Sequence, residues 1–552
     1  MFQRIKCMIN LDFTNLIIQF SFNKKDNLGK LHIFTEKYFN QVVILVLSII
    51  SILTFIWFYN NNLGLAYNDA RSHLDIGRRV VEGLKPGLAQ IGSVWLPLQH
   101  FLMIPTIWND FMWHSGLSRA LISMISFVGT GYLIYLYLQK MGVGIFGRLF
   151  GIFVFIANIN ILYLQSTAMT ELLLIVLMMA GVYELMLWHN TEEIFHLIKA
   201  AFWIFLSSLV RYDGWFLIIF ASVLIVFHTS KKRIHKMSEG NFIFFSTLAG
   251  LGIGLWLLWN LLIFKDPLYF AFGPFSAHTQ QAQIEQAGEL ATKGNLILSV
   301  RTYLYALIYN SGALIVLLGT IGMVAFWFDK RIKESVRIAS SALLAPLIFN
   351  ILALFMGHSV LFIEGITGKT WFNARYGVML VPVFAIFIGY LIQRVKPFRY
   401  LIIGLILFVT FFSYGNVDAV TIDDAKVGSS QKNVTEVSGW LNKNAKSEKG
   451  FVLISVASHD AIIFSSGLPM KKYIHEGTGK YWDEATTNPA HWARWIIMRT
   501  YDDNDLTYSN IKNNPDLSKY DLVEKFPFSD IYQLKPEFVE GLVTEPILGK
   551  QK

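Results

Sequence analysis

The sequence predicts a polytopic α-helical membrane protein with about eleven spans and a C-terminal extracytoplasmic α/β domain. Of its 552 residues, 54% are hydrophobic and only 15% are charged, whereas an ordinary soluble domain carries about 25% charged residues. The mean hydropathy is +0.46. The net charge of +9 comes from short basic clusters between apolar runs. That pattern is typical of membrane loops and does not indicate nucleic-acid binding.

A bilayer core of about 30 Å requires about 20 apolar helical residues. Runs of this kind lie near residues 41–59, 118–138, 146–162, 170–188, 198–211, 213–229, 242–264, 308–328, 336–356, 376–393 and 399–415. They predict a transmembrane region over 41–415. Residues 1–40 contain no short apolar core with a cleavage site, so we expect a cytoplasmic segment and a first span that acts as its own signal.

The distribution of Lys and Arg predicts the orientation. If the N-terminus is cytoplasmic, the loops on that side are short and basic, as at 230–241 and 329–335, and the outer loops are longer and poorer in Lys and Arg. This is the usual arrangement in a cell membrane. An odd number of spans then places the C-terminal segment outside, so we expect a multi-pass plasma-membrane protein.

The composition changes near residue 416, where long apolar runs give way to short ones. Expected strands and helical stretches alternate there, at 451–456, 495–498, 520–523 and 530–534 for strands and at 434–441 and 490–493 for helix. Alternation of this kind predicts a small α/β domain over 416–552.

Unusual polar residues gather in the predicted outer loops. They are Asp69 and His73 in the first loop, Glu171 in the second, Arg211 and Asp213 in the third, His278 in the fourth, and Lys369 and Arg375 in the fifth. Ionisable groups near membrane depth are costly and tend to be paired or functional. Their collection on one side is the strongest indication of a site.

Several of these residues also have structural explanations. Asn68 or Asp69 could cap the helix that follows, and Glu171 suits a helix N-terminus. Arg211 and Asp213 could form a self-contained pair that closes a hairpin. On the helix after residue 68, Asp69 and His73 share one face. Arg71, Asp75, Arg78 and Arg79 share a second face, which we expect to be salt-bridged and interfacial, with Asp75 paired to Arg71 and Arg79.

The predicted soluble domain adds little chemistry. His459-Asp460 follows a predicted strand, but a lone His-Asp pair is a weak signal. No stretch has the spacing of a metal site, a phosphate-binding glycine loop or a nucleophile elbow.

Short strings across residues 40–415 resemble a known family. They are Tyr67-Asn68-Asp69-Ala70, Gln165 to Glu171, Arg211-Tyr212-Asp213-Gly214-Trp215, Asp266 to Phe270 and Arg375-Tyr376. With the long first outer loop and the C-terminal domain, they resemble the glycosyltransferase C superfamily. Within it, the chain is most similar to prokaryotic enzymes related to the protein O-mannosyltransferases and the lipid A aminoarabinose transferase.

The resemblance implies a glycosyltransferase with a polyprenyl-phosphate-linked sugar as donor and an inverting transfer. Asp69 matches the family's acid in the first loop, its general base. Many members have a paired acid there, whereas this chain has Asn68-Asp69-Ala70-Arg71. The departure weakens the case for a metal bridged by this loop. A divalent metal ion remains an open alternative as a cofactor, with Glu171 or His73 as its second ligand. No other cofactor is expected.

A lipid phosphate leaves as a stabilised anion, so a single carboxylate base suffices, and fixed cations stabilise the departing charge. The expected phosphate ligands are Arg375, Arg211, Lys369 and His278. The other expected site residues are His73, Glu171, Asp213 and Tyr376. We expect membrane lipids as partners and a glycan, lipid or protein acceptor. The alternative is a multispan transporter or flippase of a lipid-linked sugar, although its usual inverted repeats are not apparent in the sequence.

Overall fold

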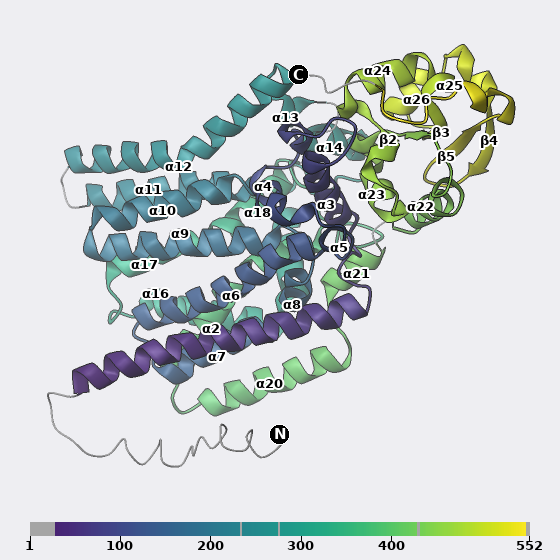
Figure 1. Cartoon of the computed structure of the whole chain (residues 1–552). Helices are drawn as coiled ribbons and strands as arrows, with labels where there is room; N and C mark the ends of the chain where they lie inside the picture. The colour runs from purple at the N-terminus through teal and green to yellow at the C-terminus, as the bar shows by residue number, and fades with distance from the viewer. Residues whose placement is uncertain (1–27, 232–234, 274–275, 287, 428–430, 548–552) are drawn as a thin grey trace, which may run out of the picture. The chain divides into compact units, whose positions relative to one another are not determined.

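The computed structural model describes residues 28–231, 235–273, 276–286, 288–427 and 431–547 (Figure 1). The chain divides into two compact units, residues 1–49 and 50–552. Most of the predicted cytoplasmic N-terminal segment, residues 1–27, lies outside the described residues, as do 232–234 of the basic loop at 230–241.

Eight stretches of the described chain are helical, long and apolar enough to cross a membrane. They lie in α2 (Leu28–Asn60), α6 (Leu117–Lys140), α9 (Glu171–Thr191), α11 (Asp213–Ser230), α12 (His235–Phe264), α17 to α18 (Glu334–Phe355), η4 with α19 (Ala374–Arg394) and α20 with α21 (Arg399–Gly415, Val420–Val427). Two bent pairs add spans to make ten: α7 (Ile145–Ile156) with α8 (Ile159–Gln165), and α15 (Leu296–Ser311) with α16 (Ala313–Phe328).

The polytopic helical fold is therefore confirmed, with eight to ten candidate spans where about eleven are predicted. The run near 198–211 forms α10 (Ile194–Ser208), which has 15 residues. At 1.5 Å per residue, this helix is about 22 Å long, shorter than a bilayer core. It nevertheless joins the end of α9 at Thr191 to Arg211, which contacts Glu171 at the other end of α9. The pair α15 and α16 bends by 107° at Gly312, whose φ of 86° suits a residue without a Cβ.

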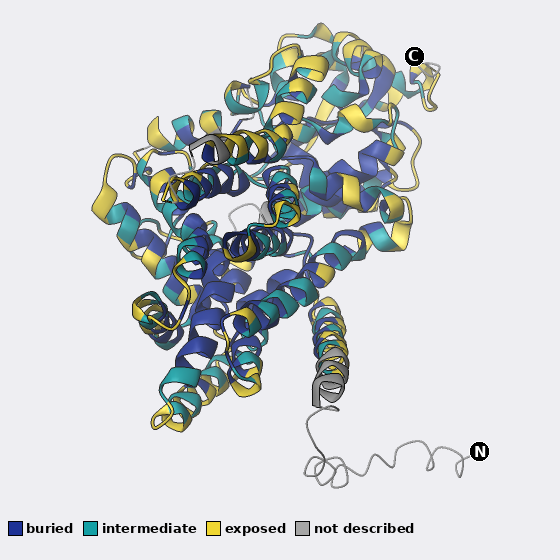
Figure 2. Ribbon diagram, turned by 90° about the vertical axis from the view of Figure 1, so that its left-hand side faces the viewer, coloured by how far each residue is buried: buried dark blue, intermediate teal, exposed yellow. Residues whose placement is uncertain are grey.

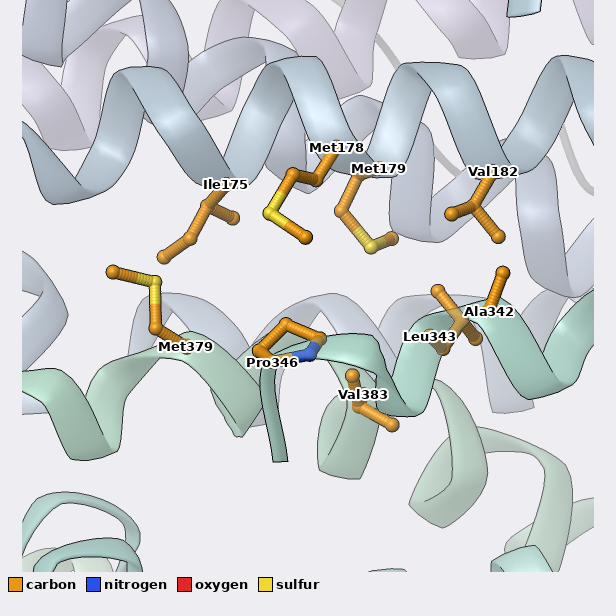
Figure 3. A pocket seen from close by; sticks show the side chains of 9 residues that line it. All are labelled: Ile175, Met178, Met179, Val182, Ala342, Leu343, Pro346, Met379 and Val383. Carbon is orange, nitrogen blue, oxygen red and sulfur yellow. The ribbon is translucent and has the colours of Figure 1, made fainter. Parts of the chain in front are cut away.

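The centre of the helical region is formed by α9 and α19. The apolar windows of their spans are 83% and 89% buried, compared with 6% for the span that contains α20. Figure 2 shows the buried residues gathered along the interior helices. Figure 3 shows Met178 and Met179 of α9 facing Met379 and Pro346 across a gap of about 20 Å³. This apolar gap has room for about one water molecule, so it belongs to the core packing.

Three of the predicted cytoplasmic loops meet one another. The Lys231 ammonium lies 2.5 Å from a carboxylate oxygen of Glu334, and Lys333 donates to the amide oxygen of Asn190 at 2.9 Å. These residues follow or precede α9, α11 and α17. The short basic loops therefore lie together, as one side of a membrane topology requires.

The first long loop folds into α3 (Asn68–Val81), η2 (Leu88–Ile91), α4 (Leu98–Ile107) and α5 (Asp110–His114). Helix α3 packs against α23 (Val456–Ser466) of the C-terminal region (Figure 1). Arg79 forms an ion pair with Asp460 of α23 at 2.5 Å, and Arg71 donates to Ser465 at 3.0 Å. The predicted interfacial role of this face of α3 is therefore wrong, because it binds the C-terminal region, and Arg79 pairs with Asp460 rather than Asp75.

The C-terminal α/β region contains one five-stranded sheet of order β2-β1-β3-β5-β4. Its strands are β1 (Phe451–Leu453), β2 (Tyr473–Ile474), β3 (Ala493–Met498), β4 (Tyr520–Lys525) and β5 (Asp530–Leu534). Strand β1 pairs in parallel with β2 and β3, and β5 is antiparallel to β3 and β4. Its helices, besides α23, are α22 (Gln431–Ala445), α24 (Lys480–Thr487), α25 (Pro489–Trp492) and α26 (Leu506–Ile511), and its 3-10 turns are η5 (Met470–Lys472), η6 (Glu476–Thr478), η7 (Pro515–Lys519) and η8 (Pro536–Gly541).

The four strands expected from sequence are confirmed, and the two-residue β2 was too short to predict. The α/β character of this region is confirmed with them. The domain boundary at residue 416 stays a prediction. Helix α21 follows that boundary and packs against α8 and η4 of the helical region.

We expect Gly377→Ala to destabilise the protein by about 1–3 kcal/mol, as overpacking does. A Cβ at Gly377 would lie 2.2 Å from the carbonyl oxygen of Ala306 on α15, so η4 would have to shift. Unfolding of purified protein in detergent measures the effect. Gly404→Ala is the matched control, because a Cβ at that position would have no neighbour within 4 Å. Equal stability of the two variants would contradict the close packing of η4 on α15.

The carboxyl of Asp75 in α3 gives a pH prediction. Burial, followed by the nearby carboxylate of Asp460, raises the pKa of Asp75 well above its usual value. A raised folded-state pKa stabilises the fold at low pH, and this stabilisation is lost as pH rises through that pKa. The melting temperature of Asp75→Asn relative to wild type should therefore rise with pH. Asp483→Asn, at an exposed position on α24, should show no such trend, and a flat difference for Asp75→Asn would contradict the assignment.

Candidate active site

One guanidinium joins three acids that are distant in sequence. Nη2 of Arg375 lies 2.7 Å from Oδ2 of Asp69, and its Nε lies 3.1 Å from Oε1 of Glu171. Nη1 lies 3.7 Å from Oδ2 of Asp424. The Arg375 side chain is only 7% exposed. This single buried cation therefore ties α3, α9 and α21 together at the end of the helices where the predicted outer loops meet.

The backbone before Arg375 sets its direction. Asn373 has a φ of 55°, a left-handed conformation that Asn tolerates better than most residues. Its side-chain amide donates to the carbonyl of Val360 at 2.9 Å, which holds the turn. Arg375 then enters the 3-10 helix η4, which packs against α15. The turn thus aims the guanidinium at the three acids.

Tyr67, directly before α3, completes the environment of Asp424. Its hydroxyl lies 3.1 Å from Oδ2 of Asp424 and donates to the carbonyl of Thr421 at 2.8 Å. The guanidinium of Arg375 lies 4.9 Å from the centre of the Tyr67 ring, a distance at which cation–π attraction operates. The start of α3 is therefore held against α21 by both a hydrogen bond and a cation.

Arg211 forms a second bridge in the same cluster. Its Nη1 lies 3.3 Å from Oε1 of Glu171, and its Nε lies 3.2 Å from Oδ2 of Asp213. The guanidinium lies 4.5 Å from the ring centre of Tyr376. The expected Arg211–Asp213 pair exists, but it is not self-contained, because Arg211 also binds Glu171. Five of the predicted residues thus meet with Asp69: Glu171, Arg211, Asp213, Arg375 and Tyr376.

The four acids of the cluster differ in accessibility. The side chain of Asp69 is 45% exposed, whereas those of Glu171, Asp213 and Asp424 are 0%, 3% and 3% exposed. The three buried carboxylates therefore hold the arginines in place. Asp69 is the one of the four that a substrate can reach, and its ion pair with Arg375 fixes its orientation.

His73 does not share the surroundings of Asp69, although the two are one helical turn apart. It is 3% exposed. Its Nδ1 lies 3.2 Å from Nε2 of His100 on α4, and its ring lies 4.4 Å from that of Trp95. Burial, and after it the neighbouring His100, lowers the pKa of His73 well below its usual value. The imidazole is therefore neutral and packs beneath the first loop.

His278 and Lys369 are not brought to the cluster. Both side chains are exposed, and the His278 ring packs near Phe272, 5.7 Å between centroids. Within the described part of the chain, neither forms a hydrogen bond or ion pair with the arginines or acids of the cluster. Their role as phosphate ligands stays a prediction without support from geometry.

Two residues of the site were missed in the sequence. Asp424 follows the last span, in a segment predicted to be part of the soluble domain. Arg119 lies in α6 and is completely buried. Its Nη1 donates to Ser123 at 3.2 Å, and among the described residues its Nε and Nη2 have no hydrogen-bond partner. An arginine at the start of an apolar run is the signal in the sequence that could have identified it. Glu171 carries the negative charge that acts on Arg119.

The residues present do not fit a metal ion. Among the residues that the structure describes, no group of three or more His, Cys, Asp and Glu side chains is placed to hold one. Asp69 and Glu171 both bind Arg375, so a guanidinium supplies the positive charge between them. His73, the other expected ligand, binds His100 instead.

No protein-family model matches the chain, and no curated protein matches its sequence. Among solved structures it is similar to ArnT from Cupriavidus metallidurans in the apo state, with a TM-score of 0.54 and 10% identity, and to the same protein bound to undecaprenyl phosphate, with a TM-score of 0.53 and 9% identity. Both matches cover 88% of this chain and 98% of ArnT.

A weaker match is the Archaeoglobus fulgidus oligosaccharyltransferase in complex with Zn and sulfate, with a TM-score of 0.46 and 12% identity over 88% of this chain and 73% of that chain. ArnT is the lipid A aminoarabinose transferase named above. Its likeness to this chain shows a shared fold, as the resemblance in the sequence predicts.

We expect Arg375→Leu to destabilise the protein by about 3–5 kcal/mol, because it leaves Glu171 and Asp424 buried without their cation. Arg301→Leu, at an exposed position on α15, is the control and should change stability by no more than about 0.5 kcal/mol. Chemical or thermal unfolding of both variants in the same detergent measures this. Similar losses in the two variants would show that the cluster does not depend on Arg375.

Proposed function

We propose that the protein is a membrane glycosyltransferase that moves a sugar from a polyprenyl-phosphate donor to an acceptor hydroxyl. The observation that carries the proposal is a half-exposed carboxylate, Asp69, held by a buried arginine. It lies in the first loop of a fold similar to that of ArnT, a protein solved with undecaprenyl phosphate bound. The acceptor is a glycan, a lipid or a protein.

Asp69 acts as the general base. It accepts the proton of the acceptor hydroxyl while the acceptor oxygen forms a bond to the anomeric carbon of the donor sugar. The bond from that carbon to the phosphate oxygen breaks, and the electron pair leaves with the lipid phosphate. Attack occurs opposite the leaving group, so the anomeric configuration inverts. One carboxylate is enough, because the phosphate, unlike an alkoxide, needs no proton to leave.

Arg211 and Arg375 stabilise the departing phosphate. Fixed cations act most strongly where charge develops in a site that excludes water, and a planar guanidinium matches the phosphate geometry. The side chain of Arg211 is 17% exposed and that of Arg375 is 7% exposed. We therefore assign the first contact with the phosphate to Arg211, and assign to Arg375 the additional task of holding Asp69.

The site is proposed to lie on the extracytoplasmic side of the plasma membrane. The basic loops that contact one another through Lys231, Glu334 and Lys333 are predicted to be cytoplasmic. The residues of the cluster come from the other set of loops. The lipid chain of the donor then lies among the apolar helices, and its phosphate reaches the arginines at their outer end.

We expect Asp69→Asn to lower transfer by about 10²–10⁴-fold, which is the usual contribution of a general base. The assay uses purified protein in nanodiscs, a panel of polyprenyl-phosphate sugars, and detection of sugar release or transfer. Asp423→Asn is the matched control, because Asp423 is exposed and lies beside the cluster residue Asp424. Donor binding should persist in Asp69→Asn.

Three outcomes would contradict this assignment in different ways. Unchanged turnover in Asp69→Asn would show that Asp69 is not the base. Loss of both donor binding and turnover would show that Asp69 is needed to bind the donor. Donor binding by wild type without any turnover, accompanied by movement of the lipid-linked sugar across a vesicle membrane, would support the transporter alternative.

A further inference from the structure

A cavity of about 530 Å³ lies between the first loop and the C-terminal region, and Asn68, the residue before Asp69, is part of its lining. Its volume falls within the range of about 300–1,000 Å³ that is typical of ligand sites. Three parts of the chain line it: α3 with the segment that follows, the end of α12 with α13 (Tyr269–Phe272), and the C-terminal region around α23. Figure 1 shows α3 and α23 side by side.

One stripe of α3 faces this cavity. Asn68, Ser72, Ile76 and Arg79 line it, and their spacing of four, four and three residues places them on one helical face. Asn68 immediately precedes Asp69. The lining of the cavity therefore extends to the residue next to Asp69 in the chain.

Aromatic rings form much of the remaining wall. Phe264 and Tyr269 are stacked with 4.6 Å between ring centres and an angle of 4° between ring planes. Trp95 lines the cavity and packs against His73 with its ring. Phe528 lines it from the side of the C-terminal region. Flat aromatic faces beside amide and hydroxyl groups are the surface that a sugar ring, with its apolar C–H face and its hydroxyl rim, can cover.

The cation of the described cavity lining is already paired with a carboxylate. Arg79, the one arginine or lysine of its described lining, forms a buried ion pair with Asp460. The Glu476 carboxylate accepts hydrogen bonds from the backbone N–H groups of Val456 and Ala457 at 3.0 and 2.8 Å. No described lining residue therefore offers an uncompensated cation, so the cavity favours a neutral ligand over a phosphate or an acidic peptide.

His459 supplies an unused polar atom. Its Nε2 lies 2.7 Å from Oδ2 of Asp505, and its side chain has no exposed surface. Asp505 is itself fixed by the backbone N–H groups of Arg499, Thr507 and Tyr508. Among the described residues, Nδ1 of His459 has no hydrogen-bond partner. Because Asp505 accepts the proton of Nε2, Nδ1 is an acceptor without a donor among the described residues, and it is enclosed behind the wall of the cavity.

We propose that this cavity is the acceptor site and that the acceptor is a neutral sugar, held by Trp95 and the Phe264–Tyr269 stack. This inference rests on the proposed function and names its acceptor as a carbohydrate. The acceptor sugar occupies the cavity and presents a hydroxyl to Asp69 past Asn68 and Ser72.

The test measures binding separately from transfer. Wild-type protein in nanodiscs is titrated calorimetrically with cellobiose, mannobiose and N,N′-diacetylchitobiose, and with inorganic phosphate and an acidic peptide for comparison. We expect at least one neutral disaccharide to bind, and to bind at least tenfold more weakly to Ala457→Trp, which fills the cavity from an exposed lining position. Asn510→Trp, exposed on α26, should bind like wild type. Thermal unfolding confirms that each variant is folded.

Absence of binding by every neutral sugar would overturn the inference, as would equal affinity in Ala457→Trp, or binding of the phosphate or the peptide in their place. Transfer from polyprenyl-phosphate donors is assayed in the same preparations. Disaccharide binding that Ala457→Trp removes, without any transfer, would support the cavity while contradicting the proposed function. Donor turnover without disaccharide binding would support the proposed function and would contradict a neutral sugar as the acceptor.

Discussion

The guanidinium of Arg375 is the interaction on which the site depends. It contacts acids from α3, α9 and α21, and Arg211 extends the network to the start of α11 through Glu171 and Asp213. Burial of these charges is costly unless each is paired. The network therefore forms only when all of these helices are in place. The position of the Asp69 carboxylate is therefore determined by the whole fold rather than by its own loop.

The C-terminal region is joined to the same helix. Asp69 begins α3, and the pair between Arg79 and Asp460 lies near the other end of that helix. Arg71 binds Ser465 of α23 between them. Helix α3 therefore connects the exposed Asp69 carboxylate with the region that lines the large cavity. This arrangement gives the C-terminal region a direct mechanical link to the proposed chemistry, which a separate, loosely tethered domain would not have.

Much of this arrangement could be predicted from sequence. The apolar runs and the Lys and Arg clusters divided the loops into two sets, and Asp69, Glu171, Arg211 and Arg375 fell in the same one. Contacts between distant residues could not be predicted. Asp424 follows the last span and has no local pattern that points to Arg375. Asp69 and His73 share a helical face, but His73 contacts His100 instead of the cluster. Tertiary packing decides which neighbour each residue of a face contacts, and the sequence alone does not show it.

The central claim is that one carboxylate, Asp69, drives a direct displacement at the anomeric carbon. The measurement that tests it most directly is the anomeric configuration of the product, determined by proton NMR with a donor of known configuration that wild type turns over. A single base and an attacking acceptor predict inversion. Retention of configuration would require a second, nucleophilic carboxylate and a covalent intermediate, and would contradict the account.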